Sequence, residues 1–288
     1  MVVAGRVIKR FLAAVLVAAA PVLSLVETKA GETPEREIKT SRRVVSLDYC
    51  ADQYVLHFVD RDRIAALSPD AGKPFSFYRD KAVGVRQVAP RAETILAMQP
   101  DLVVRSYGGG PKAVTYFQQA GIRVVQLPNA QRLADIPAIT RQIGTLLGAP
   151  QKAEATARHA EAALARPTVA LGETLLYMTP GGLTAGRGTL MDDLIRHAGY
   201  DNYETGEGWR TLPLEKLVRE PPNRVVYASF GAGYADKNKW SASRHPVAQA
   251  LPDDRRTSLS GAVTSCGAWF MLDALKILAA PAGKAEHR

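Results

Sequence analysis

The sequence predicts an α/β protein of two similar lobes, each with a central, mostly parallel sheet, joined by a single long rigid helix. Short β-branched runs alternate with helical segments in both halves, which is typical of parallel sheets covered by helices. One pattern also occurs twice. Glu93 and Glu215 each open a short helical segment, a proline follows seven residues later, and a Val-Val strand comes next. The repeat indicates two halves of the same plan.

The first lobe is expected to span residues 42–147. Its strands are expected where β-branched residues cluster, and its helices where apolar residues recur with helical spacing. The expected strands are 44–47, 64–67, 102–104 and 122–125, and the expected helices are 51–59, 92–99, 111–120 and 134–147. The turn Gly108-Gly109-Gly110 lacks the Gly-Lys-Ser/Thr ending of a phosphate loop, but as a turn that opens a helix it could receive an anionic ligand group on free N–H groups.

Residues 150–166 are predicted to form the helix that bridges the lobes. Ala, Glu, Lys and Arg dominate this stretch and apolar residues are sparse, so the helix should be largely exposed and stiff. The second lobe is expected to span residues 168–285. Its expected strands are 173–178 and 224–228, and its expected helices are 189–198, 213–219 and 269–280.

Residues 1–30 are predicted to be a cleaved signal peptide. Basic residues between Arg6 and Arg10 precede an apolar stretch, residues 11–25, and small residues suited to cleavage end at Ala30. The apolar stretch is shorter than the roughly 20 residues of a membrane span, although an uncleaved anchor remains an alternative. No cysteine follows this stretch directly, so a lipid-anchored form is not expected.

The charge and cysteine content suit an exported protein that is not a nucleic-acid binder. Lys and Arg exceed Asp and Glu by 37 to 28, but the basic residues are dispersed and not interleaved with aromatics. The positive charge could suit an anionic ligand or keep the chain soluble. The two cysteines, Cys50 and Cys266, could form a disulfide in an oxidising compartment or remain separate buried thiols.

Catalytic signatures are missing from the sequence. It has no G-x-S-x-G or H-E-x-x-H motif, and its five histidines show no metal-ligand spacing, so no catalytic or metal-binding residue is predicted.

Ligand-binding candidates come from the predicted strand ends, because loops at the carboxyl edge of parallel strands form a crevice. They are Tyr49, Arg105 and Tyr107 in the first lobe and Arg187, Trp209 and Trp240 in the second. Aromatic rings there could grip a bulky apolar or planar ligand, and Arg187 could pair with a carboxylate or phosphate. The alternative is that these rings only fill the space between the lobes.

Together these motifs give a resemblance to the periplasmic substrate-binding proteins of ABC importers for iron chelates and vitamin B12, the helical-backbone class III that includes the cobalamin-binding proteins. The resemblance covers nearly the whole mature chain. It is carried by Arg43–Leu47, Glu93–Ser106 with the glycines that follow, the bridging helix, Thr184–Met191, His197–Gly199 and Trp209–Val226.

The resemblance implies two Rossmann-like lobes and a metal chelate bound in the cleft between them. It further implies a monomeric periplasmic protein without a cofactor or catalytic activity, which delivers the chelate to an ABC permease in the inner membrane. By motif position, Glu93 and Glu215 would dock on arginines of that permease. Without the resemblance, each glutamate is also explained by the helix dipole, which favours a carboxylate in the first turn.

The resemblance leaves the chelate open. Trp209 matches an aromatic that cobalamin-binding proteins place against the corrin, but Ser106 stands where they carry a second tryptophan, with Tyr107 beside it. A ferric siderophore would suit Arg105 and Arg187, whereas haem would take Tyr49 or Tyr107 as a ligand. Two other functions stay in view: an exported α/β hydrolytic enzyme, and a binding-only protein for metal sensing without a transporter.

Overall fold

The computed structural model describes residues 43–166, 169–231 and 241–280, all within one compact unit of residues 33–288. The predicted signal peptide and Trp240 lie outside these ranges. None of the helices in the described ranges has the length and apolar character that a membrane crossing requires.

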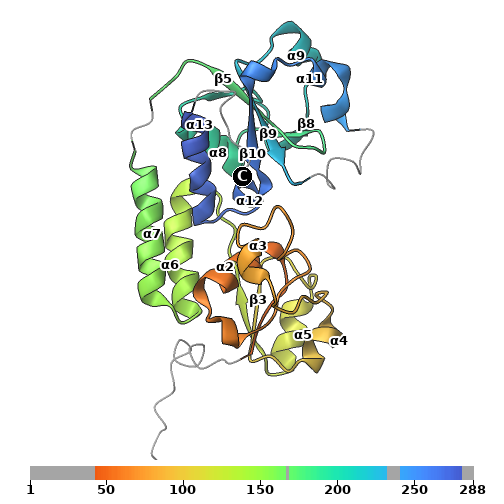
Figure 1. Cartoon of the computed structure of the whole chain (residues 1–288), viewed down its shortest axis with the longest axis vertical. Helices are drawn as coiled ribbons and strands as arrows, with labels where there is room; N and C mark the ends of the chain where they lie inside the picture. The colour runs from red at the N-terminus through yellow and green to blue at the C-terminus, as the bar shows by residue number, and fades with distance from the viewer. Residues whose placement is uncertain (1–42, 167–168, 232–240, 281–288) are drawn as a thin grey trace, which may run out of the picture. The chain divides into compact units, whose positions relative to one another are not determined.

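The first lobe is built on a sheet of four parallel strands in the order β2-β1-β3-β4 (Figure 1). Its strands are β1 (Val44–Ser46), β2 (Ile64–Ala66), β3 (Leu102–Arg105) and β4 (Arg123–Gln126). In the centre of the sheet, Val45 pairs with Val103, and both side chains are fully buried. Buried β-branched residues of this kind favour the pleated, two-faced environment of a parallel sheet.

Helices cover both faces of this sheet. They are α2 (Tyr49–Phe58), the 3-10 turn η1 (Arg61–Arg63), α3 (Arg79–Ala82), α4 (Ala92–Ala97) and α5 (Ala113–Gln119). Val104 packs in the core cluster that contains most of α2, whereas Val103 packs with Ile95 of α4 and Phe117 of α5. Side chains of neighbouring strand residues point to opposite faces, so α2 covers one face and α4 and α5 cover the other.

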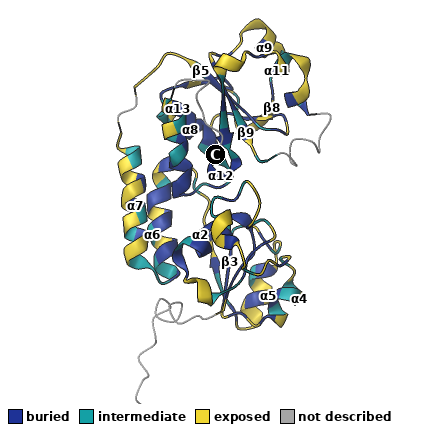
Figure 2. Cartoon of the chain, viewed as in Figure 1, coloured by how far each residue is buried: buried dark blue, intermediate teal, exposed yellow. Residues whose placement is uncertain are grey.

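Two packed helices follow the first lobe. After the 3-10 turn η2 (Leu133–Asp135), α6 (Ile136–Leu146) and α7 (Pro150–Leu164) lie side by side (Figure 1). Gly148 makes the turn between them with a φ of 86°, a conformation that favours glycine. On α7 only three alanines are buried, Ala153, Ala157 and Ala160, and the outer face is exposed (Figure 2). The exposed helix expected at 150–166 is therefore present, packed along α6.

The second lobe repeats the first sheet. Four parallel strands stand in the order β10-β9-β5-β7, which, counted along the chain within the lobe, is the same order as in the first lobe. The strands are β5 (Thr174–Met178), β7 (Asp201–Asn202), β9 (Arg224–Ser229) and β10 (Arg256–Ser260). Helix α4 with Glu93 precedes the third strand of its lobe, and α9 (Leu214–Arg219) with Glu215 does the same. The repeated motif thus occupies the same topological place in each half.

The second lobe also contains a small antiparallel sheet, β6 (Leu183–Ala185) with β8 (Trp209–Thr211), that the sequence did not predict. Its remaining elements are short. They are α8 (Leu190–His197), η3 (Ala242–Arg244), α11 (Pro246–Gln249), η4 (Asp253–Arg255), α12 (Gly261–Thr264), η5 (Trp269–Leu272) and α13 (Asp273–Ala279). The single helix expected at 269–280 is therefore a 3-10 turn followed by α13.

An aromatic cluster joins the lobes beside α6 and α7. The Trp269 ring lies 5.0 Å from the ring of Tyr54 and 4.7 Å from that of His57, measured between centroids. The His57 ring nitrogens lie within hydrogen-bonding distance of Tyr78 and of Thr156 on α7. Burial, followed by the charges of nearby lysines, lowers the pKa of His57 to about 3, so the ring is neutral in this cluster at ordinary pH.

Candidate ligand-binding site

A groove runs between the two lobes as three adjoining cavities of about 300, 430 and 580 Å³. The first cavity contains Tyr107 of the first lobe, the second contains Trp209 of the second lobe, and the third contains Arg187. The first two cavities share residues 265–267, and the last two share Gly188 and Gly208, so the groove is continuous. The combined volume of the three cavities is sufficient for a ligand of drug size or larger.

The wall on the first lobe is a loop held mainly by one buried carboxylate, with one further hydrogen bond from the Gln126 side chain to the Ser106 carbonyl at 2.6 Å. Asp48 follows β1, caps α2 through the Ala51 N–H at 3.0 Å, and is 3 % exposed. The same carboxylate accepts hydrogen bonds from the N–H groups of Ser106, Tyr107 and Gly108 at 2.7, 3.1 and 2.9 Å. It also accepts one from the Ser106 hydroxyl at 2.6 Å. A carboxylate with several N–H donors is a strong anchor, so this loop is fixed in position.

This arrangement removes Gly108 from the N–H groups that the glycine turn could offer to an anionic ligand group. The N–H of Gly108 is directed to Asp48, so the protein supplies its own anion there. Gly108 is also packed against β1, and a Cβ atom at this position would lie 2.3 Å from the carbonyl oxygen of Leu47. Close backbone packing therefore requires glycine at this position.

Tyr107 is the most exposed aromatic of this wall, with 62 % of its surface accessible. Partial burial, followed by the nearby carboxylates of Asp48 and Asp70, raises the pKa of Tyr107 to about 12. The phenol is therefore neutral at ordinary pH and can donate a hydrogen bond or present its ring to a ligand.

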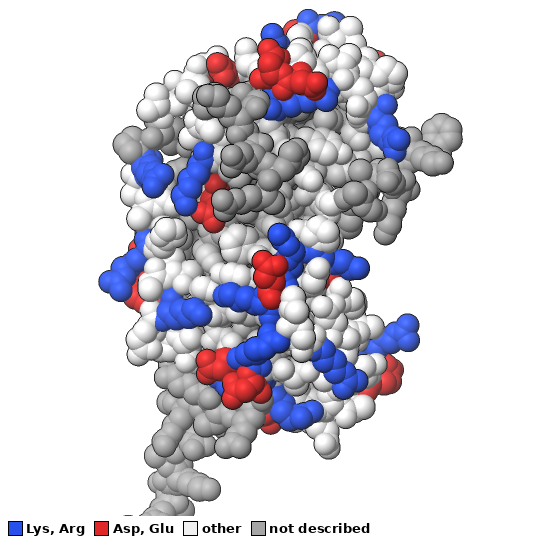
Figure 3. Space-filling view, viewed as in Figure 1, with Lys and Arg blue, Asp and Glu red and all other residues white. Residues whose placement is uncertain are grey.

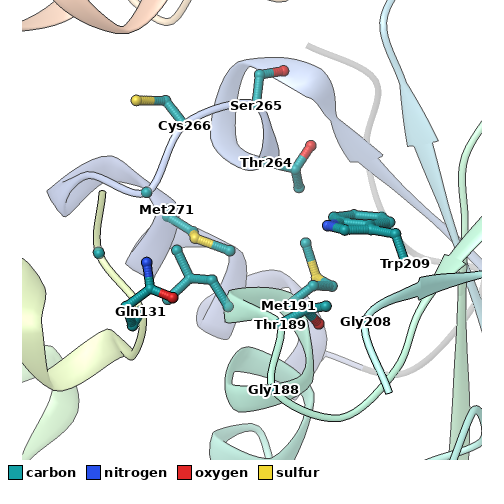
Figure 4. Close-up of a pocket in the computed structure, with 13 residues that line it drawn as sticks. Gln131, Gly188, Thr189, Met191, Gly208, Trp209, Thr264, Ser265, Cys266 and Met271 are labelled. Carbon is teal, nitrogen blue, oxygen red and sulfur yellow. The ribbon is translucent and has the colours of Figure 1, made fainter. Parts of the chain in front are cut away.

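The wall on the second lobe is formed by the small sheet and its glycine turns. Trp209 begins β8, pairs with Ala185 of β6, and is 55 % exposed. Its ring rests edge-on against the buried Tyr177, with centroids 6.0 Å apart. The exposed remainder of the indole faces the cavity (Figure 4). A large apolar surface held in place on one side suits contact with an apolar or planar ligand on the other.

Arg187 lies at the end of the groove, on a turn fixed by backbone hydrogen bonds. Its N–H donates to the Gly206 carbonyl at 2.7 Å, and its carbonyl accepts from the Gly208 N–H at 2.9 Å. The adjacent Gly186 packs so tightly that a Cβ atom there would lie 2.1 Å from the Gly206 oxygen. The Arg187 side chain itself is exposed beside Glu207. Basic side chains are otherwise dispersed among acidic ones over the face shown in Figure 3.

The floor of the groove is a segment that the sequence did not single out. The end of α12 and the turn that follows it, residues 264–267, line the cavities together with Met191 of α8 and Met271 of η5 (Figure 4). Cys266 in this floor is bonded to Cys50 at the start of α2, with the two Cα atoms 5.7 Å apart. The only signal in the sequence was the run of small residues around Cys266, which is compatible with many kinds of turn.

Three of the six predicted ligand residues line this groove: Tyr107, Arg187 and Trp209. Two others are placed elsewhere. Tyr49 is 3 % exposed, its hydroxyl lies 3.4 Å from the Ala262 carbonyl as donor, and burial raises its pKa. Arg105 is 7 % exposed, and its buried Nε has no hydrogen-bond partner among the described residues. Both are covered by the protein and do not face the groove.

Neither predicted docking glutamate touches the groove. Glu93 and Glu215 are both exposed, and neither forms an ion pair with another described residue. In the described part of the chain, no group of three or more His, Cys, Asp or Glu side chains is arranged to hold a metal ion.

Comparisons with known proteins agree with this architecture. The sequence pattern of the family described as "Periplasmic binding protein" matches residues 44–252. A vitamin B12-binding protein of Pectobacterium atrosepticum is 26 % identical over 217 residues, which cover 69 % of this chain and 73 % of that protein.

Solved structures show the same fold. The crystal structure of a periplasmic haem-binding protein of Pseudomonas aeruginosa matches with a TM-score of 0.64 and 25 % identity, over 85 % of this chain and 94 % of that one. The periplasmic vitamin B12-binding protein of Vibrio cholerae matches with a TM-score of 0.63 and 16 % identity, over 83 % of this chain and 95 % of that one.

Proposed function

The chain belongs to the periplasmic binding protein family, and on that premise we propose that it captures a metal chelate in the groove between its lobes and delivers it to an ABC permease. The observation that carries the proposal is the groove itself, which has an exposed aromatic ring on each side, Tyr107 and Trp209, and Arg187 at one end. The family and the similar proteins are binding proteins and not enzymes, which sets the hydrolase alternative aside.

The lining favours a large, partly flat ligand with an anionic periphery. Trp209 offers a planar apolar face, and Met191 and Met271 extend this apolar surface along the same cavity. Thioethers adapt their shape to a ligand and contact aromatic systems favourably. Arg187 can pair with a carboxylate at the edge of such a ligand. Haem, with its two propionates, satisfies these conditions. A corrinoid offers the flat face, but its edge carries amides and it would pair a phosphate with Arg187. A ferric siderophore that carries aromatic groups is the alternative within the same class.

A titration of the purified protein tests this proposal. Cyanocobalamin, haemin and a ferric catecholate siderophore are each added while tryptophan fluorescence and the absorbance of the chelate are recorded. We expect saturable binding of at least one of the three. Trp209→Ala should weaken that binding by about tenfold, because it removes an apolar contact in a desolvated site. Saturation by none of the three chelates would contradict the proposal.

The matched control is Tyr116→Ala. Tyr116 is an exposed aromatic of α5, is 48 % accessible, and lines none of the three cavities of the groove. Its removal should leave the affinity unchanged. If both variants lost the same amount of chelate affinity, the loss in Trp209→Ala could not be assigned to a contact in the groove.

We also propose that Glu93 and Glu215 dock on the permease. Supporting this role, each is exposed in the first turn of the helix that precedes the third strand of its lobe. Glu93→Ala combined with Glu215→Ala should keep chelate affinity and the free energy of unfolding while abolishing uptake by cells. The control pair, Asp62→Ala with Asp254→Ala, also removes one exposed carboxylate from each lobe and should leave uptake intact. Loss of chelate binding in the glutamate pair would instead assign these residues a structural role.

The protein is further proposed to act as a monomer in the periplasm. Light scattering during size-exclusion chromatography, with and without chelate, measures the mass directly.

A further inference from the structure

We propose that the Cys50–Cys266 disulfide is a latch that fixes the two walls of the groove relative to each other, and that a bound chelate shields it from reduction. The bond joins the first turn of α2 in the first lobe to the floor segment after α12 in the second. The inference deepens the proposed chelate binding and rests on it in part.

The first turn of α2 is attached to the second lobe at more than one point. Beside the disulfide, the Tyr49 hydroxyl lies 3.4 Å from the Ala262 carbonyl as donor, and the Cys50 sulfur lies 3.9 Å from the Ser265 carbonyl. Both contacts are weak: the first is long for a hydrogen bond, and in the second the disulfide sulfur has no hydrogen to donate. The covalent bond is therefore the element that holds this turn against residues 262–266.

The same turn controls the position of the wall that carries Tyr107. Asp48, two residues before Cys50, holds the N–H groups of residues 106–108. On the other side of the bond, Thr264 and Cys266 line the cavity that contains Trp209. A displacement of Cys50 from Cys266 would thus change the separation between the Tyr107 wall and the Trp209 wall.

Other contacts between the lobes would survive loss of the bond. Trp269 packs on Tyr54 and His57, and the rings of Phe77 and Phe270 stack at 4.6 Å. Because these apolar contacts lie in the common core, breaking the disulfide should loosen the groove without unfolding the protein.

The bond is placed where a ligand would cover it. Cys50 lines the cavity beside Tyr107, and Cys266 lines both that cavity and the one beside Trp209. Reduction by a dithiol requires a thiolate to attack one of the two sulfurs and form a mixed disulfide, which the second thiol of the reductant then resolves. Two electrons and two protons pass to Cys50 and Cys266, and the dithiol becomes a disulfide. A chelate in the groove would block the approach of the attacking thiolate.

The first test compares the wild type with Cys50→Ser combined with Cys266→Ser, with no reductant present. If the competent arrangement of the walls falls to about a tenth of the population, the affinity for cyanocobalamin or haemin should weaken about tenfold. We expect the loss to come from a slower apparent association rate, because only the competent fraction of the free protein binds. Equal affinities in the two proteins would overturn the proposal.

The second test follows reduction of the wild-type disulfide by dithiothreitol, with alkylation and mass measurement at successive times. Saturating cyanocobalamin or haemin, whichever binds, should slow reduction at least about tenfold, because the attacked sulfurs must be accessible. The rate at which oxidised glutathione is reduced in a parallel mixture with the same chelate is the control, because it shows whether the chelate itself consumes the reductant. If the chelate leaves the rate of disulfide reduction unchanged, the proposal that a bound chelate shields the disulfide is wrong.

A third test needs no ligand and separates this inference from the proposed function. Hydrogen exchange at residues 106–108 and 264–267 should accelerate when the bond is reduced, while exchange in β3 and β9 stays unchanged. Unchanged exchange at both loops would overturn the latch even if chelates bind. If no chelate binds but exchange accelerates at both loops, the proposed function fails and the latch stands.

Discussion

In the first lobe, the loop that carries Tyr107 is held mainly by one carboxylate, with one further bond from the Gln126 side chain. In the second lobe, the segment that carries Trp209 and Arg187 is held mainly by backbone hydrogen bonds, with single bonds from the Asn202 and Glu204 side chains in addition. Both lobes use the same order of four parallel strands. The difference arises in the connections, because only the second lobe contains the β6–β8 pair. The sheet is therefore a common support, and each lobe builds its groove wall independently at the strand ends.

This contrast predicts which kind of amino-acid substitution each groove wall tolerates. A wall that depends on one side chain fails when that side chain is removed. A wall that depends on backbone pairing resists most side-chain changes but fails when a Cβ atom is forced between its strands. Three substitutions test the contrast, from the largest expected effect to the smallest.

The largest effect is expected from Asp48→Ala. It leaves three N–H groups of the Tyr107 loop and the cap of α2 without their acceptor, and should lower the free energy of unfolding by about 4 kcal/mol. The hydroxyl of Thr179, directly after the first strand of the second lobe, bonds only Leu183 among the described residues, so Thr179→Ala should cost about 1 kcal/mol or less. Urea unfolding measures both. Similar losses at the two positions would contradict the contrast.

The next effect concerns how the free energy of unfolding depends on pH, and it compares one buried carboxylate of each lobe. In the second lobe Asp192 is paired with Arg196 at 3.1 Å, whereas Asp52 of the first lobe forms no ion pair with another described residue and accepts hydrogen bonds from the N–H and hydroxyl of Ser68. Burial, opposed by these hydrogen bonds, raises the pKa of Asp52 to about 7. The folded protein then holds an extra proton between about pH 4 and pH 7, so this group lowers the free energy of unfolding as pH rises through that window.

Asp52→Asn should remove this contribution. The free energy of unfolding of the wild type, relative to that of the variant, should fall by on the order of 3 kcal/mol from pH 4 to pH 7. His57, whose pKa is lowered, contributes the opposite slope to both proteins and cancels in the difference. Denaturant titrations at several pH values supply the measurement. A difference that stays constant with pH would show that Asp52 is ionised throughout.

The smallest effect is expected from Gly186→Ala in the second wall. The added Cβ atom would meet the Gly206 carbonyl oxygen and push the paired turns apart, at a cost of about 2 kcal/mol and with weaker chelate binding. Gly181→Ala in the same lobe is the control, since its Cβ atom would meet only the Thr179 hydroxyl at 3.7 Å. Thermal unfolding and chelate titration compare the two. If Gly186→Ala were neutral, the second wall would be less rigid than its backbone bonds indicate.

Much of the scaffold could be predicted from the sequence because its signals are strong. Buried parallel strands such as residues 102–104, Leu-Val-Val, are continuous apolar runs rich in β-branched residues, and Pro100 and Pro222 mark where helices must end. The two-lobed α/β fold and membership of the family are confirmed. The small sheet was missed because the three residues of β8 are all exposed and show no apolar alternation, and β10 because its sequence, Arg-Thr-Ser-Leu-Ser, contains a single large apolar residue.

The candidate site was predictable only in part. Position at a strand end identified Tyr107 and Arg187, but it does not determine the direction of a side chain, and Tyr49 and Arg105 are buried. The floor at residues 264–267 consists of small residues whose role depends on their place in the fold. Whether these groups bind a chelate, and which one, stays a prediction for the titrations above.

The bond between Cys50 and Cys266 also changes the topology of the chain. Its ends are separated by 216 in sequence, so it closes most of the polypeptide into a covalent ring. A protease that cuts one peptide bond anywhere inside the ring would open the circle without releasing a fragment. A protein nicked once in this way would migrate as a single species in denaturing electrophoresis until a reductant separates it into two fragments. Before reduction, the two fragments would stay covalently joined and could remain folded against each other.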